Sequence, residues 1–105
     1  MAYSVYHSAR FDKELKKFGK DFLEWLDGVE NHLTENPYTG DPLGVKWFRE
    51  KKYKKYRVYF IIYDDLASVF MVGISAKKDQ QKVINTIRLL LDFFRGEIEN
   101  LAKKQ

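Results

Sequence analysis

The stretch from Tyr53 to Tyr63 is apolar on both of its alternating faces, and this constrains the fold more than any other feature of the chain. Successive side chains of a strand point to opposite faces of a sheet. One face would carry Tyr56, Val58, Phe60 and Ile62, and the other would carry Arg57, Tyr59, Ile61 and Tyr63. Because strands buried on both faces lie at the centre of a sheet, we expect residues 53–63 to form a central strand.

Two amphipathic helices are predicted before this strand. A short strand near residues 2–7 precedes them, and Ser8 then offers a favourable N-cap for the first helix. Gly19 separates the two helices, and the second runs from Asp21 to about Glu35. Apolar residues recur every three or four positions, at Phe11, Leu15 and Phe18 and again at Phe22, Leu26, Val29 and Leu33. The short link between the helices predicts an αα-hairpin.

The remaining strands are predicted around the central one. Both prolines of the chain fall in residues 36–44, which indicates a loop between the helices and the strands. Strands are expected at residues 45–50 and 68–75, and Asp64-Asp65 supplies the turn after the central strand. Since these strands are close in sequence, an antiparallel meander is the simplest sheet that they can form.

A last helix is predicted at residues 79–103. Its apolar positions form a heptad seam, at Ile84, Ile87, Leu91, Phe94, Ile98 and Leu101. The seam fits a coiled coil as well as a helix packed on its own sheet, and we favour the second. Leu89, Leu90 and Phe93 lie outside the seam and offer a homodimer contact, while Gly96 is a candidate kink.

The expected order is therefore β-α-α-β-β-β-α, an α+β fold with a small antiparallel-rich sheet. The sheet would be packed by the N-terminal αα-hairpin and the long C-terminal helix, in a single domain spanning residues 1–105. The hydrophobic fraction of 45% is sufficient for a core, so disorder is not expected.

Composition also narrows the chemistry. There is no cysteine, which excludes disulfides, thiolate metal sites and a cysteine nucleophile. His7 and His32 are far apart in sequence, so we expect no metal site and no cofactor. Neither a signal peptide nor an apolar run of the ~20 residues that span a bilayer is evident. We expect a soluble, cytoplasmic protein without a membrane partner.

Positive charge is concentrated between Lys46 and Arg57. Seven basic side chains and one acidic side chain give this segment +6, whereas the whole chain carries +4. The basic residues are Lys46, Arg49, Lys51, Lys52, Lys54, Lys55 and Arg57, and they are interleaved with Trp47, Phe48, Tyr53 and Tyr56. Cations attract phosphates and aromatic faces stack on unpaired bases, so the segment indicates nucleic-acid binding. The alternatives are a solvated hairpin, and an ion pair between Arg57 and Glu50 or Asp64.

Several motifs, taken in order, resemble the RelE/ParE toxin superfamily of toxin–antitoxin systems. They are the helix Phe11–Phe18, the loop Asn36-Pro37 with Gly40-Asp41-Pro42-Leu43-Gly44, the Lys55–Tyr63 strand, Val72-Gly73-Ile74-Ser75, and the basic turn Lys77-Lys78-Asp79. The resemblance covers about residues 3–83, and the turn followed by Gln80 is similar to the HigB-like branch. It implies the β-α-α-β-β-β-α toxin fold.

The resemblance also implies a function. RelE-like members cleave mRNA in the ribosomal A site without a metal ion, and the 2′-hydroxyl of the RNA attacks while cations stabilise the phosphate. Arg57 matches the arginine of their central strand, Lys77 or Lys78 matches a second cation, and Arg49 is the nearest candidate for a third. The implied partners are the ribosome, mRNA and an acidic, partly helical antitoxin.

One departure from the family pattern concerns proton transfer. RelE-type enzymes often carry a tyrosine four to six residues after the basic turn, whereas no tyrosine follows Tyr63 here. That role would fall to Tyr53, Tyr56 or Tyr59. Two alternatives to the nuclease therefore stay open. One is a non-catalytic member of the fold that binds RNA or the ribosome or inhibits gyrase, and the other is a protein-interaction module.

Overall fold

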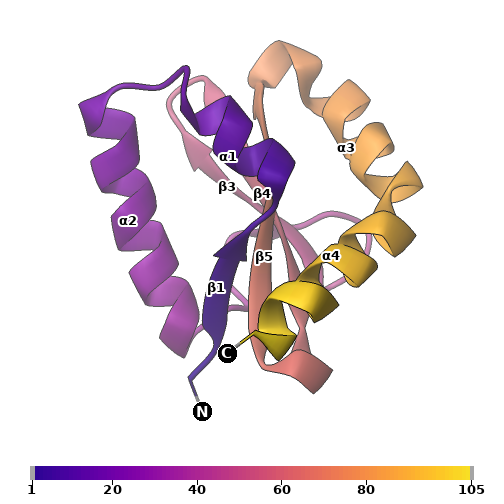
Figure 1. Cartoon of the computed structure of the whole chain (residues 1–105). Coiled ribbons are helices and arrows are strands. Elements are labelled where there is room, and N and C mark those ends of the chain that lie inside the picture. The colour runs from indigo at the N-terminus through magenta and orange to yellow at the C-terminus, as the bar shows by residue number, and fades with distance from the viewer. Residues whose placement is uncertain (1, 105) are drawn as a thin grey trace.

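A five-stranded sheet lies between two pairs of helices (Figure 1). The computed structural model describes residues 2–104. The elements are β1 (Ser4–His7), α1 (Ala9–Leu15), α2 (Lys20–Glu35), β2 (Asp41–Pro42), β3 (Phe48–Tyr53), β4 (Tyr56–Tyr63), the 3₁₀ turn η1 (Asp64–Leu66), β5 (Ser68–Ala76), the 3₁₀ turn η2 (Lys77–Asp79), α3 (Gln80–Leu89) and α4 (Leu91–Lys103). The predicted α+β class is confirmed. Within residues 2–104, no helix is both long and apolar enough to cross a bilayer.

The strand order is β1-β5-β4-β3-β2. Strand β1 is parallel to β5, and the other neighbouring pairs are antiparallel. The central position of β4 agrees with its two apolar faces, but the strand begins at Tyr56 and not at the predicted residue 53. Lys54 adopts φ +54°, so the β3–β4 hairpin turns between Tyr53 and Tyr56. A left-handed lysine carries no glycine or proline signal, which explains the wrong boundary.

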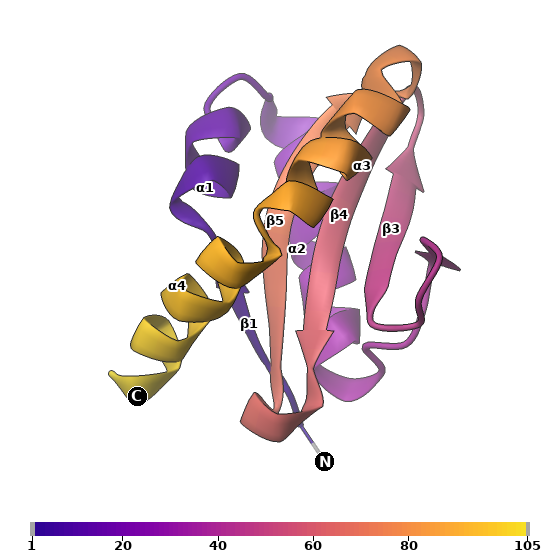
Figure 2. The same cartoon turned by 90° about the vertical axis from the view of Figure 1, so that its right-hand side faces the viewer.

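Each face of the sheet has its own hydrophobic core. On one face, α1 and α2 pack through Phe11, Phe22, Leu26 and Leu33 against Val58, Phe60, Ile62, Val69, Met71 and Ile74. On the other face, α3 and α4 pack through Ile84, Ile87, Phe94 and Ile98 against Phe48, Tyr59, Ile61, Phe70 and Val72. Figure 2 shows α3 in front of β5 and β4, with β3 beside it. The two-faced burial of β4 therefore requires both helix pairs.

The C-terminal helix is broken at Leu90, contrary to the continuous helix predicted for residues 79–103. The Leu90 backbone leaves helical geometry (φ −104°, ψ +14°), and its N–H donates to the carbonyl of Ile87 in a tighter turn. Gly96 lies inside α4 without a break. The change of direction lets two short helices follow the sheet, and four of the six seam residues are buried on it. This is the packing favoured over a coiled coil, although Leu89 and Phe93 stay 86% and 63% exposed.

Gly40 is required by a close approach of two backbones. It has φ +76°, and a Cβ atom there would lie 2.2 Å from the carbonyl oxygen of Glu50. We expect Gly40→Ala to lower the free energy of unfolding by at least about 2 kcal/mol, because the residue is left-handed and its neighbour is backbone. Gly28→Ala in α2, where nothing lies within 4 Å, is the matched control and should raise it by about 0.5–1 kcal/mol. Urea unfolding of both variants measures the contrast, and equal effects would contradict it.

Candidate nucleic-acid interface

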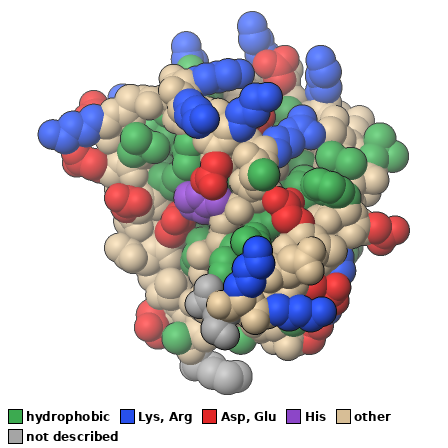
Figure 3. Space-filling view, in the orientation of Figure 1, with side chains coloured by type: hydrophobic (Ala, Val, Ile, Leu, Met, Phe, Trp, Pro, Cys, Tyr) green, Lys and Arg blue, Asp and Glu red, His purple; other side chains and the backbone are tan. Residues whose placement is uncertain are grey.

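Lysines from three segments gather around Tyr56 at one end of the sheet. The segments are the connection from α1 to α2, the β3–β4 hairpin and η2, which all reach the upper part of Figure 1. We define the lysine rim as Lys17, Lys20, Lys54, Lys55, Lys77 and Lys78. Three open hollows share Tyr56 in their lining, and each is bordered by rim lysines. Lys and Arg side chains accordingly crowd the upper margin of the surface in Figure 3.

Most of the rim charge is free to meet a ligand. Within residues 2–104, the only ion pair of a rim lysine is that of Lys20 with Glu24, at 3.8 Å on an exposed helix surface. Lys55 lies over the ring of Tyr56, 5.7 Å from its centroid, and Tyr56 itself packs edge-on against Phe18. An aromatic side chain held by packing and surrounded by lysine ammonium groups suits the binding of a phosphate backbone with an unpaired base.

Arg57 lies at the base of the rim on the α3 side of the sheet. It is only 7% exposed, and its Nη1 donates to the carbonyls of Lys54 (3.3 Å) and Tyr56 (3.0 Å). Its Nε is sealed from solvent and has no hydrogen-bond partner among residues 2–104. Within the same residues it forms no ion pair with Glu50, and Asp64 is engaged instead by the hydroxyls of Tyr3 and Tyr38. Arg57 therefore anchors the hairpin and keeps part of its guanidinium unused.

Glu50 and Tyr59 share this sheet face with Arg57. Glu50 is opposite Tyr59 in the β3–β4 register, and Lys52 is opposite Arg57. Glu50 is 4% exposed, and its Oε1 accepts a hydrogen bond from Nε2 of Gln80 at 2.7 Å. Tyr59 is completely buried, its hydroxyl lies 2.8 Å from Ser75 Oγ, and burial raises the pKa of its phenol. Tyr59, one of the three tyrosines predicted for proton transfer, is thus closed off from a ligand, and Glu50 is held on the same face by Gln80.

The other basic residues of β3 are separated from Arg57. Arg49 lies on the α1–α2 side of the sheet, opposite Phe60, and its guanidinium donates to three carbonyls of residues 39, 40 and 46. Lys51 donates to Thr39 Oγ1, and Lys52 pairs with Asp41 at 3.3 Å. Lys46 is placed over the ring of Tyr38, toward the opposite end of β4. The predicted basic run thus contributes Lys54 and Lys55 to the rim and Arg57 to its base.

Sequence reasoning missed four residues of this region, which are Lys17, Lys20, Glu50 and Gln80. Lys17 was visible as a charge on the polar side of the first helix, but only the arrangement of α1 beside β5 brings it to Tyr56. Glu50 was visible as the single acid of the basic run. The alternation of side chains in β3 could have separated it from Arg49, but only the β3–β4 register places it on the face of Arg57.

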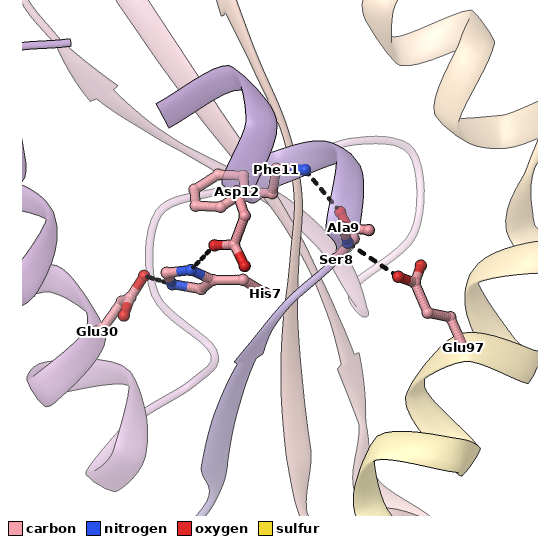
Figure 4. Close-up of polar contacts among 7 residues, drawn as sticks. All are labelled: His7, Ser8, Ala9, Phe11, Asp12, Glu30 and Glu97. Atoms are coloured by element: carbon pink, nitrogen blue, oxygen red, sulfur yellow. Dashed lines mark hydrogen bonds and ion pairs between the residues drawn. The ribbon is translucent and has the colours of Figure 1, made fainter. Parts of the chain in front are cut away.

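A second polar cluster joins β1, α1 and α2 on another part of the molecule. Figure 4 shows His7 between Asp12 and Glu30, with Nδ1 2.7 Å from Asp12 and Nε2 2.5 Å from Glu30. Both ring nitrogens can donate only when the imidazole is protonated. The hydrogen bond to Glu30, followed by that to Asp12, raises the pKa of His7 above 6.5. Within the described residues, this cluster is not arranged to hold a metal ion.

This cluster predicts a stability that depends on pH. Because the folded pKa of His7 lies above its unfolded value, its stabilisation is complete below pH 6.5 and is lost as the pH rises through the folded pKa. The difference in unfolding free energy between the wild type and His7→Gln should be largest near pH 6 and shrink by pH 9. Urea unfolding across this range measures it, and a difference that does not change with pH would contradict it.

Solved toxin structures share this fold. The chain superimposes on a double mutant of the Escherichia coli toxin RelE in the free state with a TM-score of 0.73 and 20% identity, over 86% of this chain and 99% of that one. For a RelE mutant in complex with a peptide of its antitoxin RelB, the TM-score is 0.66 and the identity is 22%, over 79% of this chain and 95% of that one. For the toxin–antitoxin complex RelBE2 from Mycobacterium tuberculosis, the TM-score is 0.63 and the identity is 19%, over 72% of this chain and 99% of that one. No protein-family model and no curated protein sequence matches the chain.

Proposed function

We propose that the protein is the toxin of a type II toxin–antitoxin system and inhibits translation by cleaving mRNA on the ribosome. The observation that carries the proposal is the lysine rim around Tyr56, with Arg57 at its base, on a RelE-like fold. Several solved structures of this fold are complexes of a toxin with its antitoxin. The site would act in the cytoplasm, where ribosomes and translated messages are available.

The geometry supports two separate roles, RNA binding by the lysine rim and phosphate stabilisation by Arg57 at its base. Exposed ammonium groups attract the RNA backbone from a distance, because their charge is not spent on internal ion pairs. Tyr56, whose ring packs on the α1–α2 side of the sheet, would stack on an unpaired base at the end of the sheet. Arg57 would stabilise the negative charge that grows on that phosphate, since its guanidinium keeps unused donors in a nearly dry environment. The 2′-hydroxyl of the RNA is the nucleophile in this scheme.

The test is inducible expression in a bacterial host, with growth and the 5′ ends of transcripts followed together. The nuclease predicts growth arrest and new 5′ ends inside translated messages, in register with codons. A neighbouring gene for a short, acidic and partly helical protein should restore growth, because such a chain would neutralise the basic rim. Growth arrest without new 5′ ends would reject mRNA cleavage, and the protein would then be a toxin that acts without cleaving mRNA.

A non-catalytic toxin is the second candidate, and the burial of the polar groups favours it. Tyr59 is sealed below α3, and Arg57 already donates to two backbone carbonyls. The rim would then hold RNA or the ribosome without cleaving it. This candidate predicts that the purified protein binds ribosomes with an affinity that falls as the salt concentration rises, as the nuclease would. The mRNA in the complex, however, stays intact.

A further inference from the structure

A carboxylate with one unused oxygen stands next to the unused donors of Arg57. Glu50 is 96% buried, yet it forms no ion pair and only one side-chain hydrogen bond among residues 2–104, the bond from Gln80 to Oε1. Its Oε2 is not sealed, because Arg57 Nε is the only fully enclosed, unpartnered side-chain atom of the described chain. Oε2 therefore reaches solvent from an otherwise buried side chain.

Arg57 also has an unpartnered nitrogen. Its Nη1 is used by the hairpin carbonyls, whereas Nη2 has no partner among the described residues and is likewise not sealed. Lys52 stands opposite Arg57 and Glu50 stands opposite Tyr59, so Glu50 and Arg57 are diagonal neighbours on one sheet face. Diagonal neighbours in an antiparallel pair lie about 7–8 Å apart at their Cα atoms. Such a spacing leaves room for one ligand group between a free carboxylate oxygen and a free guanidinium nitrogen.

A cation and an anion on one sheet face, each with an unpartnered polar atom, suit a ligand that carries both an acceptor and a proton donor. A phosphodiester next to a ribose hydroxyl offers negative oxygens to Arg57 and a proton donor to Glu50. Burial of Glu50 beside an unfilled guanidinium would be costly without such a role, since buried charges are normally paired. The hydrogen bond from Gln80, at the start of α3, fixes the orientation of the carboxylate.

We propose that Glu50 is the proton acceptor for the attacking 2′-hydroxyl, an inference that rests on the proposed nuclease function. The 2′-hydroxyl gives its proton to Glu50 Oε2, and the oxygen forms a new bond to phosphorus. The bond from phosphorus to the 5′ oxygen breaks, and this oxygen keeps the bonding pair and takes a proton from water. The hydroxide that is left takes the proton from Glu50, which restores the carboxylate. The products are a 2′,3′-cyclic phosphate and a 5′-hydroxyl. Gln80 is a positioning residue, and no tyrosine is needed.

The test compares single-turnover cleavage of mRNA in ribosome complexes by the wild type, Glu50→Gln and Glu50→Asp. The glutamine variant keeps the shape and the acceptor for Gln80 but cannot take a proton. Its rate should fall about 100-fold or more, while its affinity for the ribosome stays within about twofold. Glu50→Asp should recover at least about tenfold of the loss. Glu35→Gln, an exposed carboxylate at the end of α2, is the matched control and should cleave at the wild-type rate.

Other outcomes would overturn the proposal, in ways that separate it from the proposed function. A glutamine variant that cleaves within about threefold of the wild type would reject Glu50 as the acceptor and leave the nuclease intact. A parallel loss of rate and affinity would show a structural role instead. Absence of cleavage by the wild type would reject the nuclease itself, and the inference with it. Thermal unfolding of each variant confirms that the compared proteins are folded.

Discussion

Arg57→Ala is expected to abolish growth inhibition. The substitution removes the guanidinium at the base of the lysine rim, including Nη2, which is not sealed and has no partner among residues 2–104. Loss of one preorganised donor to a transition-state anion costs about 10²–10³ in rate, and Arg57 offers more than one. Cleavage in ribosome complexes should therefore fall at least about 100-fold. Induced expression and single-turnover cleavage both measure the effect.

Stability has to be separated from chemistry at this residue. Arg57 also donates to the carbonyls of Lys54 and Tyr56, so its loss should cost about 1–3 kcal/mol of unfolding free energy at the hairpin. Arg57→Lys keeps the charge and loses the planar fork, and it should restore binding more than cleavage. Arg95→Ala is the control, because Arg95 is held by Asp65 and Glu99 on another part of the molecule. A folded Arg57→Ala protein with full toxicity would reject the assignment.

The elements of the fold could be predicted because their patterns are local. Ser8 was predicted as an N-cap, and its hydroxyl accepts a hydrogen bond from the N–H of Phe11 at 3.0 Å. The two-faced strand and the helical spacings also correspond to observed elements. One error is the start of β3, which lies at Phe48 and not at the predicted residue 45. The others fall where a turn has no sequence signal, at left-handed Lys54 and at the break in the last helix at Leu90. In both places tertiary packing decides the backbone, and propensity does not.

The candidate site was predicted less completely than the fold, for a geometric reason. Alternation in β3 puts Arg49 and Glu50 on opposite faces, and the hairpin register puts Arg57 opposite Lys52, on the face of Glu50. Arg49 and Arg57 could therefore not belong to one site. The hairpin tip, in contrast, lies beside η2, and the N–H of Lys77 donates to the carbonyl of Lys55 at 2.8 Å. Lys17 and Lys20 come from a segment that is distant in sequence from the hairpin, and only the topology brings them to Tyr56. The local positive charge predicted the ligand class, whereas the surface that we propose for the ligand depends on the fold.

Removal of four rim lysines should largely abolish RNA binding. The variant replaces Lys54, Lys55, Lys77 and Lys78 with alanine and takes the formal net charge from +4 to zero. Each phosphate contact to single-stranded RNA contributes about −0.7 to the slope of log K against log salt, so the slope should become shallower by up to about 3. At 0.1 M salt this corresponds to a loss of affinity on the order of 10²–10³-fold. Titrations of labelled RNA at several salt concentrations measure both quantities.

The control for this variant removes the same charge elsewhere. Lys46, Arg88, Lys103 and Lys104 lie outside the lysine rim, and their replacement by alanine also brings the formal net charge to zero. If binding depended only on net charge, both variants would lose affinity equally, and the rim would have no special role. If the rim is the interface, the control keeps its slope and most of its affinity, because only cations in contact with phosphates release counterions. Because both variants have the same net charge, the comparison distinguishes binding at the lysine rim from non-specific binding by a basic protein.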